Sequence, residues 1–202
     1  ESKVANRVSE GVYDLLIDGL SADTSYQVKL VIDGNDVGDS MTIVTDKAPQ
    51  MPNSGFEVAT KAESNNWTSF FDPSSSDPSL QSKFWDSGSS ASAGMLGSSY
   101  AICYSDASVP EGIGSTKSAR LQSLAAAGKL AAGNLFTGEF AGLDGMNGKV
   151  NFGRAWNGYR PTGVRFWYKY LGGKVTNTAS SVPLTTDDYD RFQVKFALGT
   201  WD

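Results

Sequence analysis

Carboxylates are the residues of this chain that could carry out hydrolytic chemistry, because the 202-residue sequence contains no histidine. Serine triads, cysteine–histidine dyads and the usual histidine zinc sites are therefore excluded within this chain. A pair of carboxylates roughly 5 to 10 Å apart remains possible, as in glycosidases. Glu139 and Asp144, in the segment GEFAGLDG, are the candidate catalytic pair. Solvated loop acids explain both residues equally well.

The segment GRAWNGYRPTGVRFWYKYLGG, residues 153–173, combines aromatic rings with cations and could bind a ligand by stacking. If residues 164–170 form a strand, successive side chains point to opposite sides of it. One side, which we interpret as a core face, then carries Val164, Phe166, Tyr168 and Tyr170. The other side carries Arg165, Trp167 and Lys169.

Trp167 on an outward face needs a cover, since an indole ring has a large apolar area. The cover is either a carbohydrate ring, whose hydroxyls would take Arg and Lys donors, or another part of a protein. Trp85, in KFWDSGSS, is a further stacking candidate or, alternatively, an anchored core aromatic. The candidate ligand-binding residues are Trp85, Arg154, Trp156, Tyr159, Arg160, Trp167 and Lys169.

The charge and the hydropathy of the chain exclude two classes of partner. A net charge of −5 provides no basic field that would attract DNA or RNA. No stretch approaches the roughly 20 apolar residues of a membrane-spanning helix, so we expect no transmembrane segment. Cys103 is the single cysteine, which excludes an internal disulfide, and we expect it to be a buried thiol in the strand SYAICYSD.

Residues 1–48 are predicted to form a few strands. SYQVKLVID alternates apolar and polar residues, and Asp33-Gly34-Asn35 predicts a hairpin with the run that follows. Leu20 stands six residues before Tyr26, which resembles the tyrosine corner that ties a loop to a strand in immunoglobulin-like sandwiches. A whole sandwich needs about 100 residues, so we interpret residues 1–48 as the C-terminal part of an immunoglobulin or fibronectin III-like domain.

Residues 49–54 have the composition of a linker, and a second domain is predicted over residues 55–202. SSYAICYSD and DRFQVKFALGTWD alternate and predict half-buried antiparallel strands. The segment SARLQSLAAAGKLAAGNLFTG, from residue 118, is compatible with a short helix. Its three glycines favour strands over residues 118–124 and 134–140 around a glycine-rich loop. The predicted fold class is therefore all-β.

Several segments carry a family resemblance: NSGFE, FWDSG, KSARLQS, KLAAGNLFTGEF, FGRAW and YRPTGVRFWYKYLGG. Their order along residues 54–202 resembles the Putative carbohydrate metabolism domain family. Its members are secreted or surface-anchored proteins of gut bacteria, often with an immunoglobulin-like domain in front. The resemblance implies a β-jelly-roll sandwich similar to carbohydrate-binding modules and glucanases. It also implies an extracellular, cell-surface or periplasmic location, in a lipoprotein of a Gram-negative gut bacterium.

The opening Asn-x-Gly-Phe-Glu also looks like the first strand of galactose-binding-like jelly rolls, in which such a glutamate often helps to hold a structural calcium. By this resemblance Glu57 is a candidate calcium ligand, and an ordinary exposed glutamate explains it as well. We expect no required cofactor beyond this possible calcium.

Three hypotheses for function follow. The first is a monomeric, non-catalytic module that binds an oligo- or polysaccharide by aromatic stacking and hydrogen bonds from Arg and Lys. The alternatives are a glycoside hydrolase that uses two carboxylates and a structural or adhesive surface module. The exposure of Trp156 and Trp167 and the separation of the nearest carboxylates discriminate between them.

Overall fold

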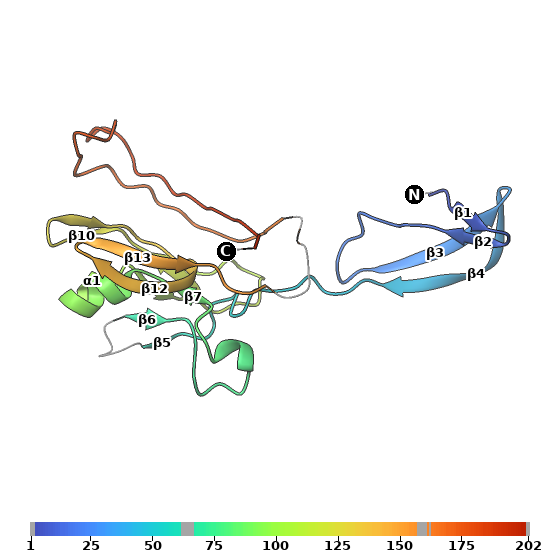
Figure 1. Ribbon diagram of the computed structural model, residues 1–202, viewed down its shortest axis with the longest axis horizontal. Helices are drawn as coiled ribbons and strands as arrows, with labels where there is room; N and C mark the ends of the chain where they lie inside the picture. The colour runs from blue at the N-terminus through green and yellow to red at the C-terminus, as the bar shows by residue number, and fades with distance from the viewer. Residues whose placement is uncertain (1–2, 62–66, 157–160, 162, 201–202) are drawn as a thin grey trace. The chain divides into compact units, whose positions relative to one another are not determined.

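The computed structural model describes residues 3–61, 67–156, 161 and 163–200. The chain divides into two compact units, Glu1–Tyr159 and Arg160–Asp202. The predicted β class is confirmed in its coarse form, since the described chain is mostly β, with one short α-helix and several small antiparallel sheets (Figure 1). Among the described residues, neither the predicted immunoglobulin-like sandwich nor the predicted jelly roll is seen.

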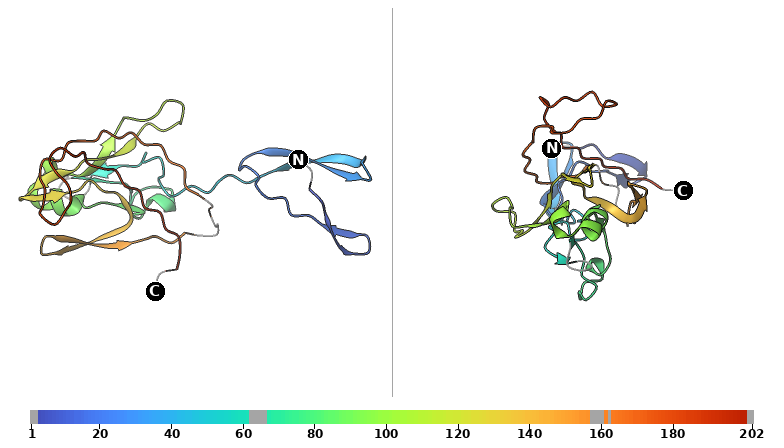
Figure 2. Two further views of the ribbon diagram at one scale, coloured as in Figure 1. Left: turned by 90° about the horizontal axis from the view of Figure 1, so that it is seen from above. Right: turned by 90° about the vertical axis from the view of Figure 1, so that its left-hand side faces the viewer.

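Two antiparallel hairpins form the N-terminal part of the first unit. β1 (Asn6–Ser9) pairs with β2 (Val12–Asp14), the dark-blue hairpin of Figure 2, and β3 (Ser25–Ile32) pairs with β4 (Asn35–Val44), the lighter-blue hairpin. The predicted β3–β4 turn is confirmed: Asp33 and Gly34 have φ values of 50° and 79°. This left-handed pair is what a two-residue hairpin turn requires.

The predicted tyrosine contact is present in the loop before β3. The backbone N–H of Ser21 donates to the Tyr26 hydroxyl at 2.8 Å. Thr45 completes this closure, because its Oγ1 donates to the Ser21 carbonyl at 2.6 Å and accepts from the Thr24 N–H at 3.0 Å. The Tyr26 hydroxyl therefore ties the loop that contains Ser21 to the start of β3, as the spacing from Leu20 to Tyr26 predicts.

Residues 55–156 form short elements around one long hairpin. β12 (Phe136–Asp144) pairs with β13 (Asn147–Phe152) on one side and with β7 (Trp85–Asp86) on the other. β8 (Cys103–Asp106) pairs with β9 (Ser118–Leu121). The remaining elements are β5 (Thr60–Lys61), β6 (Thr68–Ser69), η2 (Pro78–Leu80), α1 (Ser89–Leu96), η3 (Ser98–Tyr100), β10 (Leu124–Ala126) and β11 (Lys129–Ala131).

The segment from residue 118 forms strands and no helix, which contradicts the helix alternative and confirms the two predicted strands in part, as β9 and β12. The predicted glycine-rich loop between them is wrong, since it contains a further hairpin. The chain continues from β9 through the β10–β11 hairpin into β12. A Cβ added at Gly133 would lie only 2.7 Å from the Gln122 backbone nitrogen, so this close backbone approach requires glycine.

The helix α1 is not predicted by the apolar pattern. Its buried residues are the small Ser89, Ser92 and Ala93, so the buried face has no hydrophobic stripe. Ser89 fixes α1 to the start of β8, because its Oγ accepts from the backbone N–H groups of Ile102 at 3.2 Å and Cys103 at 3.0 Å. Within the described ranges no helix is long and apolar enough to cross a membrane.

The core lies where α1 meets the short strands. The buried apolar residues are Phe70, Ala93, Ile102, Cys103 and Ala126, which confirms the predicted burial of the thiol. Asp86 is also buried, with 8% of its side chain exposed. Its carboxylate accepts from the N–H groups of Ser87 and Phe140, both at 2.9 Å, and so ties β7 to β12.

The second unit differs from the sequence prediction. Residues 163–171 and 190–200 contain neither strand nor helix, and a single β-bridge joins Lys174 to Tyr189. The predicted core face is wrong: Val164, Phe166, Tyr168 and Tyr170 are 41% to 69% exposed. The rings of Tyr168 and Tyr170 instead stack on Phe192, with centroids 5.5 and 5.8 Å away. Ring-to-ring contacts between two segments leave the outer faces of these rings uncovered.

Candidate functional site

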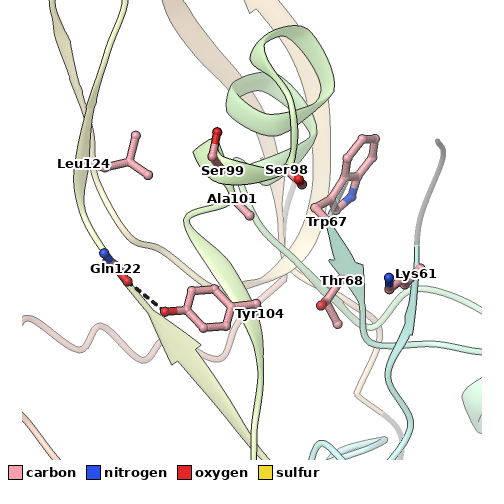
Figure 3. Close-up of a pocket in the computed structure, with 9 residues that line it drawn as sticks. All are labelled: Lys61, Trp67, Thr68, Ser98, Ser99, Ala101, Tyr104, Gln122 and Leu124. Atoms are coloured by element: carbon pink, nitrogen blue, oxygen red, sulfur yellow. Dashed lines mark hydrogen bonds between the residues drawn. The ribbon is translucent and has the colours of Figure 1, made fainter. Parts of the chain in front are cut away.

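A pocket of about 420 Å³ in the first unit is the candidate site (Figure 3). Figure 3 shows Trp67 and Lys61 on one side and Gln122 and Leu124 on the other, with Ser98 and Ser99 of η3 between them. Nine residues line it: Lys61, Trp67, Thr68, Ser98, Ser99, Ala101, Tyr104, Gln122 and Leu124.

The β5–β6 pair positions the Trp67 side of the pocket. Lys61 pairs directly with Thr68, and Trp67 immediately precedes that strand. The edge of the Trp67 indole lies against α1, where a Cβ added at Gly94 would be 3.3 Å from Trp67 Cζ3. A larger residue at position 94 would displace the ring, so the small residues of α1 make room for Trp67.

The β8–β9 pair positions Tyr104. Its hydroxyl donates to Gln122 Oε1 at 2.8 Å, and the backbone N–H of Gln122 donates to the Ile102 carbonyl at 3.0 Å. The Arg120 guanidinium lies 5.4 Å from the centre of the Tyr104 ring and pairs with Asp106 at 3.2 Å. Cation–π and hydrogen-bond contacts therefore hold Tyr104 from two directions.

The lining combines two aromatic rings with a cation, an amide and hydroxyl groups. Aromatic faces bind apolar C–H surfaces, and the polar groups can form hydrogen bonds with hydroxyl-rich ligands. Among the described residues that line the pocket, none has a carboxylate. The pocket wall as described can therefore bind a polar, ring-shaped molecule but does not contain the paired acids of a glycosidase.

Trp85, a predicted ligand-binding residue, is packed by its neighbours in the structure. Its indole N–H donates to the Pro52 carbonyl at 2.8 Å. The rings of Phe56 and Phe84 both lie 5.4 Å from the Trp85 ring, centre to centre. These contacts favour the alternative interpretation of Trp85 as an anchored core aromatic.

Arg154 is likewise engaged with the protein backbone. Its Nε donates to the Lys83 carbonyl at 2.8 Å, and its Nη2 donates to the Gly138 carbonyl at 2.6 Å. Trp156 is half-buried and has contacts of its own. Tyr159 and Arg160 lie outside the described residues. The loop from Arg154 to Arg160 is thus only partly described, and its ligand-binding role stays a prediction.

Trp167 and Lys169 belong to the second unit and are exposed, Trp167 to 68%. This exposure agrees with an outward-facing tryptophan. The alternating residues Phe166 and Tyr168 are also exposed, however, so the exposure of Trp167 alone does not single out a binding face. The ligand-binding role of Trp167 and Lys169 therefore also stays a prediction.

Glu57, the predicted calcium ligand, forms hydrogen bonds with a distant loop. Its carboxylate accepts from the Thr116 backbone N–H at 2.7 Å, the Thr116 hydroxyl at 2.6 Å and the Lys117 N–H at 3.2 Å. The Thr116 hydroxyl and N–H are the main causes of the lowered pKa of Glu57. In the part of the chain that the structure describes, no group of three or more Asp, Glu, Cys or His side chains could hold a metal ion.

Glu139 and Asp144, the predicted catalytic pair, both lie on β12. Glu139 pairs with Asn151 along the β12–β13 hairpin, whereas Asp144 pairs with Asn147 beside its turn. Asp144 is 74% exposed and faces Lys149 at 3.5 Å, which is the geometry of a solvated ion pair. The catalytic role of Glu139 and Asp144 stays a prediction.

The principal residues of the pocket are absent from the sequence-based candidates. Tyr104 lies in the predicted strand SSYAICYSD, but its alternation indicates only packing. Trp67 stands in the polar run NNWTS directly before a short strand. A tryptophan in such a polar segment could have indicated a binding residue, because its sequence neighbours do not cover the apolar ring.

Comparison with known proteins identifies the family of residues 55–201. Neither a curated protein nor a solved structure matches the chain. The family model described as Putative carbohydrate metabolism domain matches residues 55–201, well over half of the chain. This match includes every residue of the pocket. The chain therefore belongs to the Putative carbohydrate metabolism domain family.

Proposed function

We propose that residues 55–201 form a non-catalytic carbohydrate-binding domain whose ligand occupies the pocket between Trp67 and Tyr104. The observation that carries this proposal is the lining itself: aromatic rings and hydrogen-bonding groups converge on one hollow of about 420 Å³. This volume lies within the range of roughly 300 to 1,000 Å³ that is usual for small-ligand sites. It suits a terminal sugar unit or a short stretch of a glycan.

The aromatic rings and the hydrogen-bonding groups of the pocket would contact different parts of a sugar. The C–H face of a sugar ring would cover the exposed part of the Trp67 indole, which removes apolar area from water. Ser98, Ser99 and the Gln122 amide would form hydrogen bonds with the sugar hydroxyls. Tyr104 is held in place by Arg120 and Gln122 before any ligand arrives, so little ordering cost falls on that side chain.

The family membership and the pocket chemistry support a glycan ligand, and they do not favour hydrolysis. No carboxylate lines the described pocket wall, and neither Glu139 nor Asp144 is among the residues that line it. We further propose that the protein works as a monomer on the surface or in the periplasm of a bacterium, and that residues 55–202 belong to a jelly-roll domain. The family resemblance supports the location and the jelly-roll fold.

A screen of the whole chain on a glycan array, followed by titration calorimetry with the best ligand, tests the function. Trp67→Ala should weaken binding at least tenfold, while Trp67→Phe should retain part of the affinity. Trp167→Ala is the matched control, because Trp167 is an exposed tryptophan outside the pocket. Circular dichroism should show that all three variants are folded.

Two results would contradict the proposal. If no glycan on the array binds, the domain is not a carbohydrate-binding module of the proposed kind. If Trp167→Ala abolishes binding and Trp67→Ala does not, the ligand occupies the exposed segment of the second unit and the pocket is the wrong site.

A further inference from the structure

We propose that Gly94 of α1 is a positioning residue of the pocket, because it fixes the place of the Trp67 ring and, through that ring, the affinity for a glycan. This inference rests on the proposed function and adds to it a residue outside the pocket wall. Three features support it: the contact between the two residues, the backbone conformation at Gly94 and the anchoring of α1.

Gly94 lies against the edge of the Trp67 indole. A Cβ added at position 94 would be 3.3 Å from Cζ3 and 3.6 Å from Cη2 of Trp67. Both atoms belong to the outer edge of the six-membered ring. Since 3.3 Å is closer than the usual contact distance between carbon atoms, even an alanine methyl group would shift this edge by a few tenths of an ångström.

The backbone of α1 does not itself require glycine at this position. Gly94 lies in the interior of the helix, and its φ is not in the left-handed region, whereas Gly97 directly after the helix has a φ of 98°. A glycine in a helix interior makes the helix less stable than alanine would. The contact with Trp67 gives a reason for this glycine, because only a residue without a side chain leaves the ring in its place.

α1 links the Trp67 side of the pocket to the Tyr104 side. Ser89, at the start of the helix, accepts hydrogen bonds through its Oγ from the N–H groups of the two residues before Tyr104. Further along the same helix, position 94 contacts Trp67. The helix is thus fixed to the strand that carries Tyr104 and also supports the ring on the other side. A larger residue at position 94 therefore changes the place of Trp67 relative to Tyr104.

A sugar that stacks on Trp67 and forms hydrogen bonds on the Tyr104 side needs both sides in place. Side chains held in the binding geometry before the ligand arrives lower the cost of binding. Gly94→Ala should therefore weaken binding through the Trp67 ring. Because alanine favours a helix, a less stable α1 would not explain such a loss.

The test is a double-variant cycle, measured by titration calorimetry on the whole chain with the tightest-binding glycan of the array as the probe. Gly94→Ala should weaken binding at least about threefold, which is within the range of coupling between residues in contact. Trp67→Phe lacks the outer edge of the indole. In the Trp67→Phe background, Gly94→Ala should therefore change the affinity by less than about twofold.

A spectroscopic readout follows the Trp67 ring without any glycan. The Trp67 signal is the indole N–H resonance that Trp67→Phe removes from the proton–nitrogen correlation spectrum. Gly94→Ala should shift this resonance. Gly199→Ala is the matched control, because a Cβ added there has no described neighbour within 4 Å. This control should leave both the resonance and the affinity unchanged.

The inference is wrong, and the proposed function stands, if Gly94→Ala binds the probe as the wild type does or leaves the Trp67 resonance in place. An equal loss of affinity in the wild type and in Trp67→Phe would also overturn it, because the loss would not pass through the indole. So would an unfolded Gly94→Ala variant, or a comparable loss in Gly199→Ala. If no glycan on the array binds, the proposed function is wrong and the inference falls with it.

Discussion

The Asp86 carboxylate should be one of the strongest single contributors to the stability of residues 55–156. The substitution Asp86→Ala removes an acceptor that is 8% exposed and serves the N–H groups of Ser87 and Phe140, both at 2.9 Å. Asp86→Asn keeps one acceptor oxygen but directs an amide NH₂ at the other N–H group. The two variants therefore differ in the number of backbone donors left without a partner.

The expected loss follows from these two donors. Each N–H group that loses its partner costs about 1 to 3 kcal/mol, so Asp86→Ala, which leaves two of them, should lower the free energy of unfolding by about 2 to 6 kcal/mol. Asp86→Asn should cost about half as much. The ion pair with Lys83 adds little to this sum, because Lys83 is 34% exposed and its ammonium can turn to solvent. For a chain of this size, 1 kcal/mol corresponds to about 2 to 4 °C, so the loss for Asp86→Ala corresponds to a fall in Tm of roughly 4 to 24 °C.

The assay is urea unfolding followed by tryptophan fluorescence, to which Trp85, the neighbour of Asp86, contributes. Asp144→Ala is the matched control: Asp144 also faces a lysine at 3.5 Å, but it is 74% exposed. It should change the free energy of unfolding by less than about 0.5 kcal/mol. Equal effects of Asp86→Ala and Asp144→Ala would refute the reasoning, because burial and backbone contacts would then have no measurable weight.

Two further predictions concern pH and thiol reactivity. Hydrogen bonds from Thr116 hold the pKa of Glu57 below its usual value, so their stabilisation is complete above about pH 4.3 and is lost as the pH falls through the lowered pKa. The Tm difference between the wild type and Glu57→Gln should therefore shrink on acidification; a constant difference from pH 7 to pH 3 would contradict this. Burial raises the pKa of Cys103 to about 12, so iodoacetamide at pH 8 should label the protein in urea but not the native protein. Rapid labelling of the native protein would show that the thiol is accessible.

Local signals of turn and strand formation were predictable from the sequence. The Asp33-Gly34 turn and the Tyr26 hydroxyl contact depend on residues close to each other in the chain. The glycines after residue 118 likewise disfavour a helix by a local cost, and the structure forms strands there. In each case the physical cause lies within a few residues of its effect, which is the range that a sequence pattern reports.

Long-range contacts decide the features that the sequence did not predict. Trp67 reaches the pocket because Gly94 leaves room for its ring, and α1 buries serine and alanine without an apolar stripe. Arg154 was assigned to ligand binding by its neighbours in sequence, whereas its donors bind the carbonyls of Lys83 and Gly138. Such partners, 71 and 16 residues away, give no signal in the local pattern.

The Glu57 contacts close a long loop of the chain. They join residues 59 and 60 positions apart, and the enclosed stretch contains Lys61, Trp67, η3 and Tyr104. A disulfide would also restrict the unfolded chain, but Cys103 is the single cysteine, and hydrogen bonds exist only in the folded chain, so this closure pays its loop entropy on folding. The stretch that carries the pocket is thus closed by a hydrogen-bonded contact that reducing agents leave intact and acid loosens.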